Sequence, residues 1–175
     1  SGATAASADG SVVVGLNIFP LGAAQAFRWT QSGGTVGLGY LGGAPVNTSS
    51  AQGVSADGST IVGYSYTSGG SEAFRWTAGG GMVGLGHLAG DNTGYAHGIS
   101  ADGSVIVGGS GFQAARYAGG TVQGLGYLTG GSYSEAYAVS GDGSTIVGYG
   151  DSTLGYQAFR WTSGGGMQGL RTIAG

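Results

Sequence analysis

The chain has 175 residues, a net charge of −3 and no Cys, and 43 of its residues are Gly while only 2 are Pro. Charged residues make up 7% of it and none of them is Lys, so the clustered cations that bind nucleic acid are missing and nucleic acid is excluded as a partner. The lack of Cys removes disulfides and thiolate chemistry, and no apolar run approaches the ~18 residues of a membrane helix, so we expect no membrane span.

A five-residue motif recurs four times along the chain. It reads Ser-Ala-Asp-Gly-Ser, with Gly in place of Ala in the last copy, and begins at Ser7, Ser55, Ser100 and Ser140. The copies stand roughly 40–50 residues apart, a period that is typical of repeat architectures. The chain is therefore expected to contain four copies of one small structural unit.

The second repeat shows how such a unit folds. Short segments rich in apolar, β-branched and aromatic residues predict strands over residues 51–55, 60–64, 72–77 and 82–88. The pair Asp57-Gly58 lies between the first two and suits a two-residue type I′ hairpin turn. No helical stripe is present, and glycine at this density opposes a helix.

Four short antiparallel strands in each repeat predict an all-β fold, a β-propeller of four four-stranded blades. We expect a single repeat domain over 1–175, with blades at about 1–46, 47–92, 93–132 and 133–175. The third predicted strand ends in Trp29, Trp76 and Trp161 in three repeats and in Tyr117 in the other. A parallel β-solenoid is the alternative fold, although hairpin turns oppose it.

The repeats also resemble a named family, the bacterial extracellular repeat called HAF. The residues that carry the resemblance are Ala73-Phe74-Arg75-Trp76, Gly81-Met82-Val83-Gly84-Leu85-Gly86-His87-Leu88-Ala89-Gly90, Ala96-His97-Gly98-Ile99-Ser100 and Gly103-Ser104-Val105-Ile106-Val107-Gly108. The family's histidine before Ala-Phe is replaced here by Gln25, Glu72, Gln113 and Gln157. The resemblance implies a secreted or surface-displayed bacterial propeller, often part of a larger exported chain, and it implies no catalytic residue.

Charged residues recur with the repeats. The turn aspartates are Asp9, Asp57, Asp102 and Asp142, and the arginines of the third strands are Arg28, Arg75, Arg116 and Arg160. One acid and one base in each repeat indicate a structural set, in which the aspartate accepts backbone hydrogen bonds in its turn and can pair with an arginine. A ring of arginines around a channel or anion site is the functional alternative.

The sequence gives little support for a catalytic site or a metal-binding site. A glycosidase needs two carboxylates about 5–10 Å apart, and the only glutamates, Glu72 and Glu135, occupy non-equivalent places in their repeats. His87 and His97 flank Asp91 and Asn92, but both histidines are interpreted as ordinary, partly exposed residues. We therefore expect no enzymatic activity, no cofactor and no metal.

Tyrosine is the most informative surface residue. Six of the ten tyrosines are expected in or beside the variable loops, where aromatic rings can stack on sugars or anchor a protein partner. These six are Tyr64, Tyr66, Tyr95, Tyr133, Tyr149 and Tyr156.

These observations predict a non-enzymatic structural or adhesion module that is extracellular or on the bacterial cell surface. Its expected partners are other copies of itself, joined into filaments through unlocked first and last blades, or a larger exported chain. The alternative function is a carbohydrate-binding, lectin-like propeller whose partners are glycans.

Overall fold

Four antiparallel sheets of four strands each make up the protein in a computed structural model that describes residues 1–45 and 47–170. The first two are β1 (Gly2–Ala6), β2 (Val12–Ile18), β3 (Ala24–Thr30) and β4 (Gly34–Gly37), then β5 (Ser49–Val54), β6 (Thr60–Thr67), β7 (Gly70–Thr77) and β8 (Gly81–Gly84). The last two are β9 (Gly94–Ile99), β10 (Val105–Ser110), β11 (Gln113–Ala118) and β12 (Thr121–Gly124), then β13 (Ser134–Val139), β14 (Thr145–Gly150), β15 (Gln157–Thr162) and β16 (Gly166–Gly169). A short 3-10 turn, η1 (Pro20–Gly22), connects β2 to β3.

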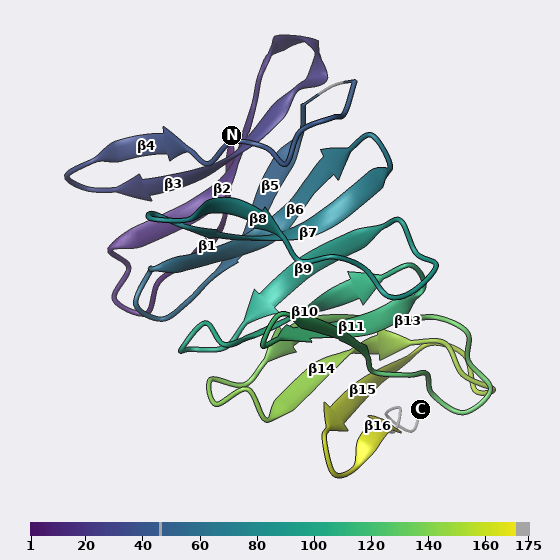
Figure 1. Ribbon diagram of the computed structural model, residues 1–175. Helices are drawn as coiled ribbons and strands as arrows, with labels where there is room; N and C mark the ends of the chain where they lie inside the picture. Colours follow the sequence, from purple (N-terminus) through teal and green to yellow (C-terminus); the bar gives the residue numbers. More distant parts are fainter. Residues whose placement is uncertain (46, 171–175) are drawn as a thin grey trace.

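Strand order within each sheet follows the chain, as in a propeller blade. The sheets pack one behind another, so that blades one and four lie at opposite ends of the molecule (Figure 1). The first strands of successive blades, β1, β5, β9 and β13, contact one another and form the inner edge of this propeller-like arrangement. Each sheet lies within one of the four expected blades, and their antiparallel pairing rules out the parallel β-solenoid.

Three hydrophobic layers hold the blades together. Between blades one and two, Val14 and Leu38 pack with Ile61 and Phe74. The next two layers repeat this plan, with Val62 of blade two meeting residues of blade three, and Val107 of blade three meeting residues of blade four. Each inner blade therefore buries both faces of its sheet, one against each neighbour.

Every first strand contains a β-bulge at the same place. The extra residue lies between Ala3 and Ala5, between Ala51 and Gly53, between Ala96 and Gly98, and between Ala136 and Ala138. These four bulge residues are Thr4, Gln52, His97 and Tyr137. A bulge bends its strand and changes the direction of the side chain at the bulge. Each bulge therefore places its own residue on the inner edge of its blade.

The hairpin turn differs from the two-residue type I′ turn that the sequence predicts. In the first copy the Gly10 N–H donates to the Ser7 carbonyl at 2.9 Å, and the Ser7 N–H donates to the Val12 carbonyl at 2.9 Å. Ala8 and Asp9 are therefore the central residues of the turn, and Gly10 follows in the left-handed region at φ 70°. The prediction was wrong because the motif's serines enlarge the loop to four residues.

These turns also connect the blades. The Ala8 N–H donates to the Ala56 carbonyl, the Ala56 N–H to the Ala101 carbonyl, and the Ala101 N–H to the Gly141 carbonyl, each at 3.0 Å. The fourth strand is shorter than predicted and ends at Gly84 in blade two, because Gly86 takes a φ of 75° and turns the chain away from the sheet.

Candidate functional site

Six tyrosines were expected in or beside loops, and the structure places most of them on strands. Tyr64 and Tyr66 lie on β6, Tyr95 on β9 and Tyr149 on β14, while Tyr133 and Tyr156 come directly before β13 and β15. Five of the six are thus beside a loop, at or next to a strand end, while Tyr64 is further inside β6 because this strand continues to Thr67.

The structure brings all six together with His97 and Tyr137, two residues that the sequence analysis did not select. We call this set the aromatic strip; it comprises Tyr64, Tyr66, Tyr95, His97, Tyr133, Tyr137, Tyr149 and Tyr156. From one end to the other, neighbouring ring centroids are 5.0–6.4 Å apart. The strip therefore runs without a break over blades two, three and four.

The centre of the strip is a stack of rings. His97 lies nearly parallel to Tyr95, with an interplanar angle of 5°, and its centroid is 5.0 Å from that of Tyr137. Tyr137 continues the stack onto Tyr149 with an interplanar angle of 9°. The central rings therefore cover part of one another's faces.

A nearly buried carboxylate fixes the histidine. The His97 Nε2–H donates to Glu135 Oε1 at 2.8 Å, and the Tyr133 hydroxyl donates to Glu135 Oε2 at 3.2 Å. Glu135 is 7% exposed, and its carboxylate lies against Gly109, within 2.7 Å of where a Cβ would stand. Blades two and four have Tyr64 and Tyr149 at the position of Gly109, so the missing side chain makes room for the acid.

Three phenols of the strip, Tyr66, Tyr133 and Tyr137, have a raised pKa and stay protonated at neutral pH. Burial, followed by a hydrogen bond with Tyr149, raises the pKa of Tyr137 to about 12. Burial also raises the pKa of Tyr133, with Tyr149 and Glu135 adding to the effect, and it raises that of Tyr66. These hydroxyls can therefore both donate and accept hydrogen bonds.

A comparison between repeats could have found His97 and Tyr137 in the sequence. Both are third from the motif serine, as are Thr4 and Gln52 in the other blades. One position that changes among Thr, Gln, His and Tyr while its surroundings repeat is typical of a variable functional site on a constant frame.

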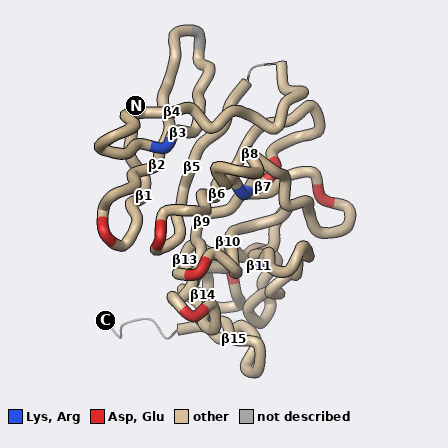
Figure 2. The backbone as a smooth tube through the Cα atoms, turned by 60° about the vertical axis from the view of Figure 1, so that its left-hand side comes forward, with Lys and Arg blue, Asp and Glu red and all other residues tan. Residues whose placement is uncertain are grey.

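The repeated aspartates form the turns, as expected. In the third copy, the Ser100 hydroxyl donates to Asp102 Oδ1 at 2.6 Å, the Ser104 N–H donates to the same oxygen at 3.0 Å, and the Val105 N–H donates to Ser100 Oγ at 3.0 Å. The pairing of an aspartate with an arginine does not occur within the described residues: there, the single close contact between a basic and an acidic side chain joins His97 and Glu135. Figure 2 shows the acidic residues of the turns at the ends of hairpins.

These turns predict a loss of stability in acid. Hydrogen bonds from Ser100 and Ser104 lower the pKa of Asp102 from 3.8 to about 2. A lowered pKa in the folded state means that the unfolded chain binds the proton more tightly, so stability rises with pH across this range. We expect the melting temperature to fall as pH drops from about 4 to about 2. Asp102→Asn should flatten this fall in scans at successive pH values, and parallel curves for the two proteins would contradict the assignment.

The repeated arginines do not line a channel. Arg28, Arg75, Arg116 and Arg160 lie on third strands, which the second strands separate from the inner edge. Arg75 borders a hollow between blades two and three together with Ile106 and Tyr117. The arginines thus belong to the faces between blades and not to a ring around an axis.

The remaining acids and His87 hold loops in place. Glu72 Oε1 accepts the Gly86 N–H at 3.0 Å, and His87 Nε2 lies 2.9 Å from the Ser71 carbonyl oxygen. Asp91, just before β9, accepts a hydrogen bond from the Ser110 hydroxyl at the end of β10, and Asp151, just after β14, accepts one from the Ser132 N–H in the loop before β13. In the described part of the chain, no group of three or more His, Asp and Glu side chains is placed to hold a metal ion.

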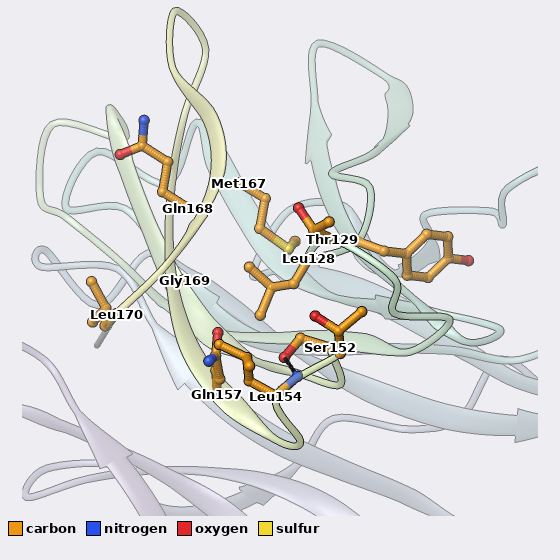
Figure 3. A pocket seen from close by; sticks show the side chains of 11 residues that line it. Leu128, Thr129, Ser152, Leu154, Gln157, Met167, Gln168, Gly169 and Leu170 are labelled. Atoms are coloured by element: carbon orange, nitrogen blue, oxygen red, sulfur yellow. Dashed lines mark hydrogen bonds between the residues drawn. The ribbon is translucent and has the colours of Figure 1, made fainter. Parts of the chain in front are cut away.

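A hollow of about 640 Å³ opens at the outer rim of blade four. Figure 3 shows Leu128 and Met167 on one side of it, with Gln157 and Leu154 on another. Among the described residues, its lining contains one phenol, that of Tyr127, and no Asp, Glu, His, Lys or Arg. None of the described helical segments is long and apolar enough to cross a membrane.

The outer face of blade four is the other unusual surface. Val14, Val62 and Val107 are fully buried between blades, whereas the equivalent Val147 is 39% exposed. Leu38 and Leu125 are 6% and 5% exposed, whereas the equivalent Leu170 is 47% exposed. Blade four thus presents to solvent the face that the three preceding blades bury.

No protein-family model and no curated protein matches the chain. Two solved structures are similar in fold at 16% sequence identity. The crystal structure of TolB from Acinetobacter baumannii matches 99% of this chain and 44% of its own, with a TM-score of 0.65. The structure of putative TolB from Agrobacterium tumefaciens matches 95% of this chain and 63% of its own, with a TM-score of 0.66. The chain spans less than two thirds of either protein and shares with them a propeller-like fold of four-stranded antiparallel blades.

Proposed function

We propose that the protein is a non-enzymatic structural or adhesion module, extracellular or on the bacterial cell surface, whose copies associate end to end. The observation that carries this proposal is the exposed outer face of blade four. Its Val147 and Leu170 hold the positions of Val14 and Leu38 in blade one and of Val107 and Leu125 in blade three, which are buried in the other blade interfaces. A face with that composition is stabilised when another blade covers it.

Blade one offers the complementary half of such an interface. Phe74 and Phe159 face the preceding blade and are fully buried, while their equivalent, Phe27, is 9% exposed. Trp29 is 36% exposed, whereas Trp161 at the same position is 7% exposed. The front of blade one therefore carries the aromatic pair that would fit against the back of blade four in a second copy.

The hydrogen bonds between turns support the same direction of association. Ala8 donates to blade two and Gly141 accepts from blade three. The outward groups of this series, the Ala8 carbonyl and the Gly141 N–H, have no backbone partner within the described residues. Joining blade four of one copy to blade one of the next would continue the series, and a head-to-tail contact that does not close produces a filament.

Two further points support a location outside the cytoplasm. The resemblance to HAF repeats implies export, and a chain of 7% charged residues without Lys or Cys suits a surface module. Low net charge also lets copies approach with little repulsion. Absence of a paired set of catalytic carboxylates among the described residues fits a role without chemistry.

The test is the native mass of the full chain, measured by light scattering over a range of concentrations. We expect the mass to rise with concentration for the natural sequence and to stay at one chain for Val147→Asp, because the charge would be buried in the contact. Val36→Asp is the matched control, since Val36 is 53% exposed on an outer strand, and it should associate normally. A natural chain that remains a monomer throughout, as it would if other blades of a longer polypeptide covered these faces, would overturn the proposal.

A further inference from the structure

We propose that the aromatic strip is a binding site for an uncharged polysaccharide chain that lies across blades two, three and four, with His97 at its centre. His97 and its neighbours on blades two and three lie away from the outer faces of blades one and four, and only Tyr149, on the same side of β14 as Val147, reaches the outer face of blade four. The inference therefore concerns the single chain and does not need association between copies.

The spacing of the strip suits a linear sugar polymer. Neighbouring ring centroids are 5.0–6.4 Å apart from Tyr66 to Tyr156, which is close to the length of one sugar unit in an extended chain. Tyr156 is 70% exposed, Tyr137 46% and Tyr66 42%, so the ends and the middle can be reached from solvent. A polymer could thus contact one ring per unit.

The polar groups of the strip call for a ligand that both donates and accepts hydrogen bonds. The hydroxyls of Tyr64, Tyr66, Tyr95 and Tyr156 make no hydrogen bond within the described residues. His97 gives its Nε2–H to Glu135, and this tautomer leaves Nδ1 as an acceptor. Hydroxyl groups of a sugar can satisfy both kinds of partner.

The charge of the strip selects against ionic ligands. The strip contains no carboxylate, and the one beside it, that of Glu135, is 7% exposed and already accepts two hydrogen bonds. No arginine belongs to the strip, so an anionic polymer would find no counter-charge, and the buried carboxylate is committed to orienting His97. Glu135 is therefore a positioning residue.

The stacking favours a sugar over a proline-rich peptide. Such peptides lie on exposed aromatic faces that form grooves. In this strip the faces of Tyr95, His97, Tyr137 and Tyr149 are turned toward one another. Partly covered faces leave no continuous groove for such a peptide, whereas a sugar polymer needs only separate exposed rings, here Tyr66, Tyr137 and Tyr156, together with hydroxyl groups for hydrogen bonding.

Blade one sets the end of the site. It carries Thr4 and Leu16 where the strip has His97 or Tyr137 and Tyr64 or Tyr149. The Thr4 hydroxyl also donates to the Ala51 carbonyl at 2.8 Å, so this hydroxyl is already hydrogen-bonded within the protein. The binding site is therefore confined to three blades, and blade one provides substitutions that the fold tolerates.

The test uses affinity electrophoresis and calorimetry of the full chain with neutral glucans and galactans, an anionic alginate and a proline-rich peptide. We expect a neutral polysaccharide to bind. Tyr137→Thr and His97→Gln, which copy the residues of blades one and two, should each weaken binding about tenfold, the effect of losing one aromatic contact. Tyr127→Thr is the control, because Tyr127 is 40% exposed outside the strip, and it should bind like the natural chain.

Three results would overturn the proposal: no neutral polysaccharide binds at millimolar concentration, only the alginate or the peptide binds, or the Tyr127 control loses as much affinity as the strip variants. Native mass of the His97→Gln variant distinguishes this inference from the proposed function, because His97 lies on β9 of blade three and association between copies should be unchanged when it is replaced.

Discussion

Gly63→Ala should be among the most damaging single substitutions in the protein. A Cβ on Gly63 would stand 1.9 Å from the Ser50 carbonyl oxygen of the neighbouring strand. The bulge at Gln52 holds that carbonyl in place, so backbone must move to make room. Overpacking against backbone costs about 3 kcal/mol, and the melting temperature should fall by about 10 °C for a chain of this length.

The matched control lies in the same blade. Gly79→Ala places its methyl where no atom lies within 4 Å, and its φ is not in the left-handed region. It should melt with the natural chain in thermal scans followed by circular dichroism. If both alanine variants melted together, the close approach of the two strands would not be a requirement of the fold.

The same close approach recurs in every blade, which connects fold to function. The corresponding distances are 2.0 Å at Gly15, 1.8 Å at Gly108 and 1.9 Å at Gly148, each to a carbonyl oxygen of the first strand. The glycine of each second strand therefore permits the bulge of the first strand. That bulge in turn positions His97 and Tyr137 on the strip.

The blades could be predicted because the sequence signals for the strands and turns of each repeat lie within that repeat. A turn motif followed by a β-branched run and a strand ending in an aromatic residue specifies a local hairpin, and four copies specify four sheets. Association of neighbouring sheets then follows from period-two alternation, which buries one side of a strand such as β10 against blade two and the other against blade four.

The turn type could not be predicted, because it depends on a side chain outside the Asp-Gly pair. Ser7 accepts the Val12 N–H at 3.0 Å and donates to Asp9 at 2.7 Å. These two bonds stabilise a four-residue loop in place of the two-residue turn that the dipeptide alone favours.

The sequence predicts only part of the aromatic strip. It identifies six of the tyrosines, but their grouping with His97 and Tyr137 depends on the bulges, which shift the alternation of each first strand by one residue. The contact of His97 with Glu135 could not be predicted either, because Glu135 is in the next blade, 38 residues away. Pairing between equivalent strands of different repeats is a property of the packed array.

Phe74→Ala should be as costly as the glycine substitution, by the opposite mechanism. The Phe74 ring is fully buried in the layer between blades one and two, where it packs with Val14 and Leu38. Removing it leaves a cavity, and such changes cost about 3–5 kcal/mol. Chemical denaturation should show the loss as a lower midpoint of unfolding.

Phe27→Ala is the internal control, because Phe27 holds the same position in blade one but is 9% exposed and lies outside the hydrophobic layers between blades. We therefore expect a smaller decrease in the midpoint at low protein concentration. When copies associate through blade one, the ring becomes covered, and the cost of Phe27→Ala should approach that of Phe74→Ala as concentration rises. Equal costs at every concentration would show that Phe27 is already packed as fully as Phe74 in the single chain.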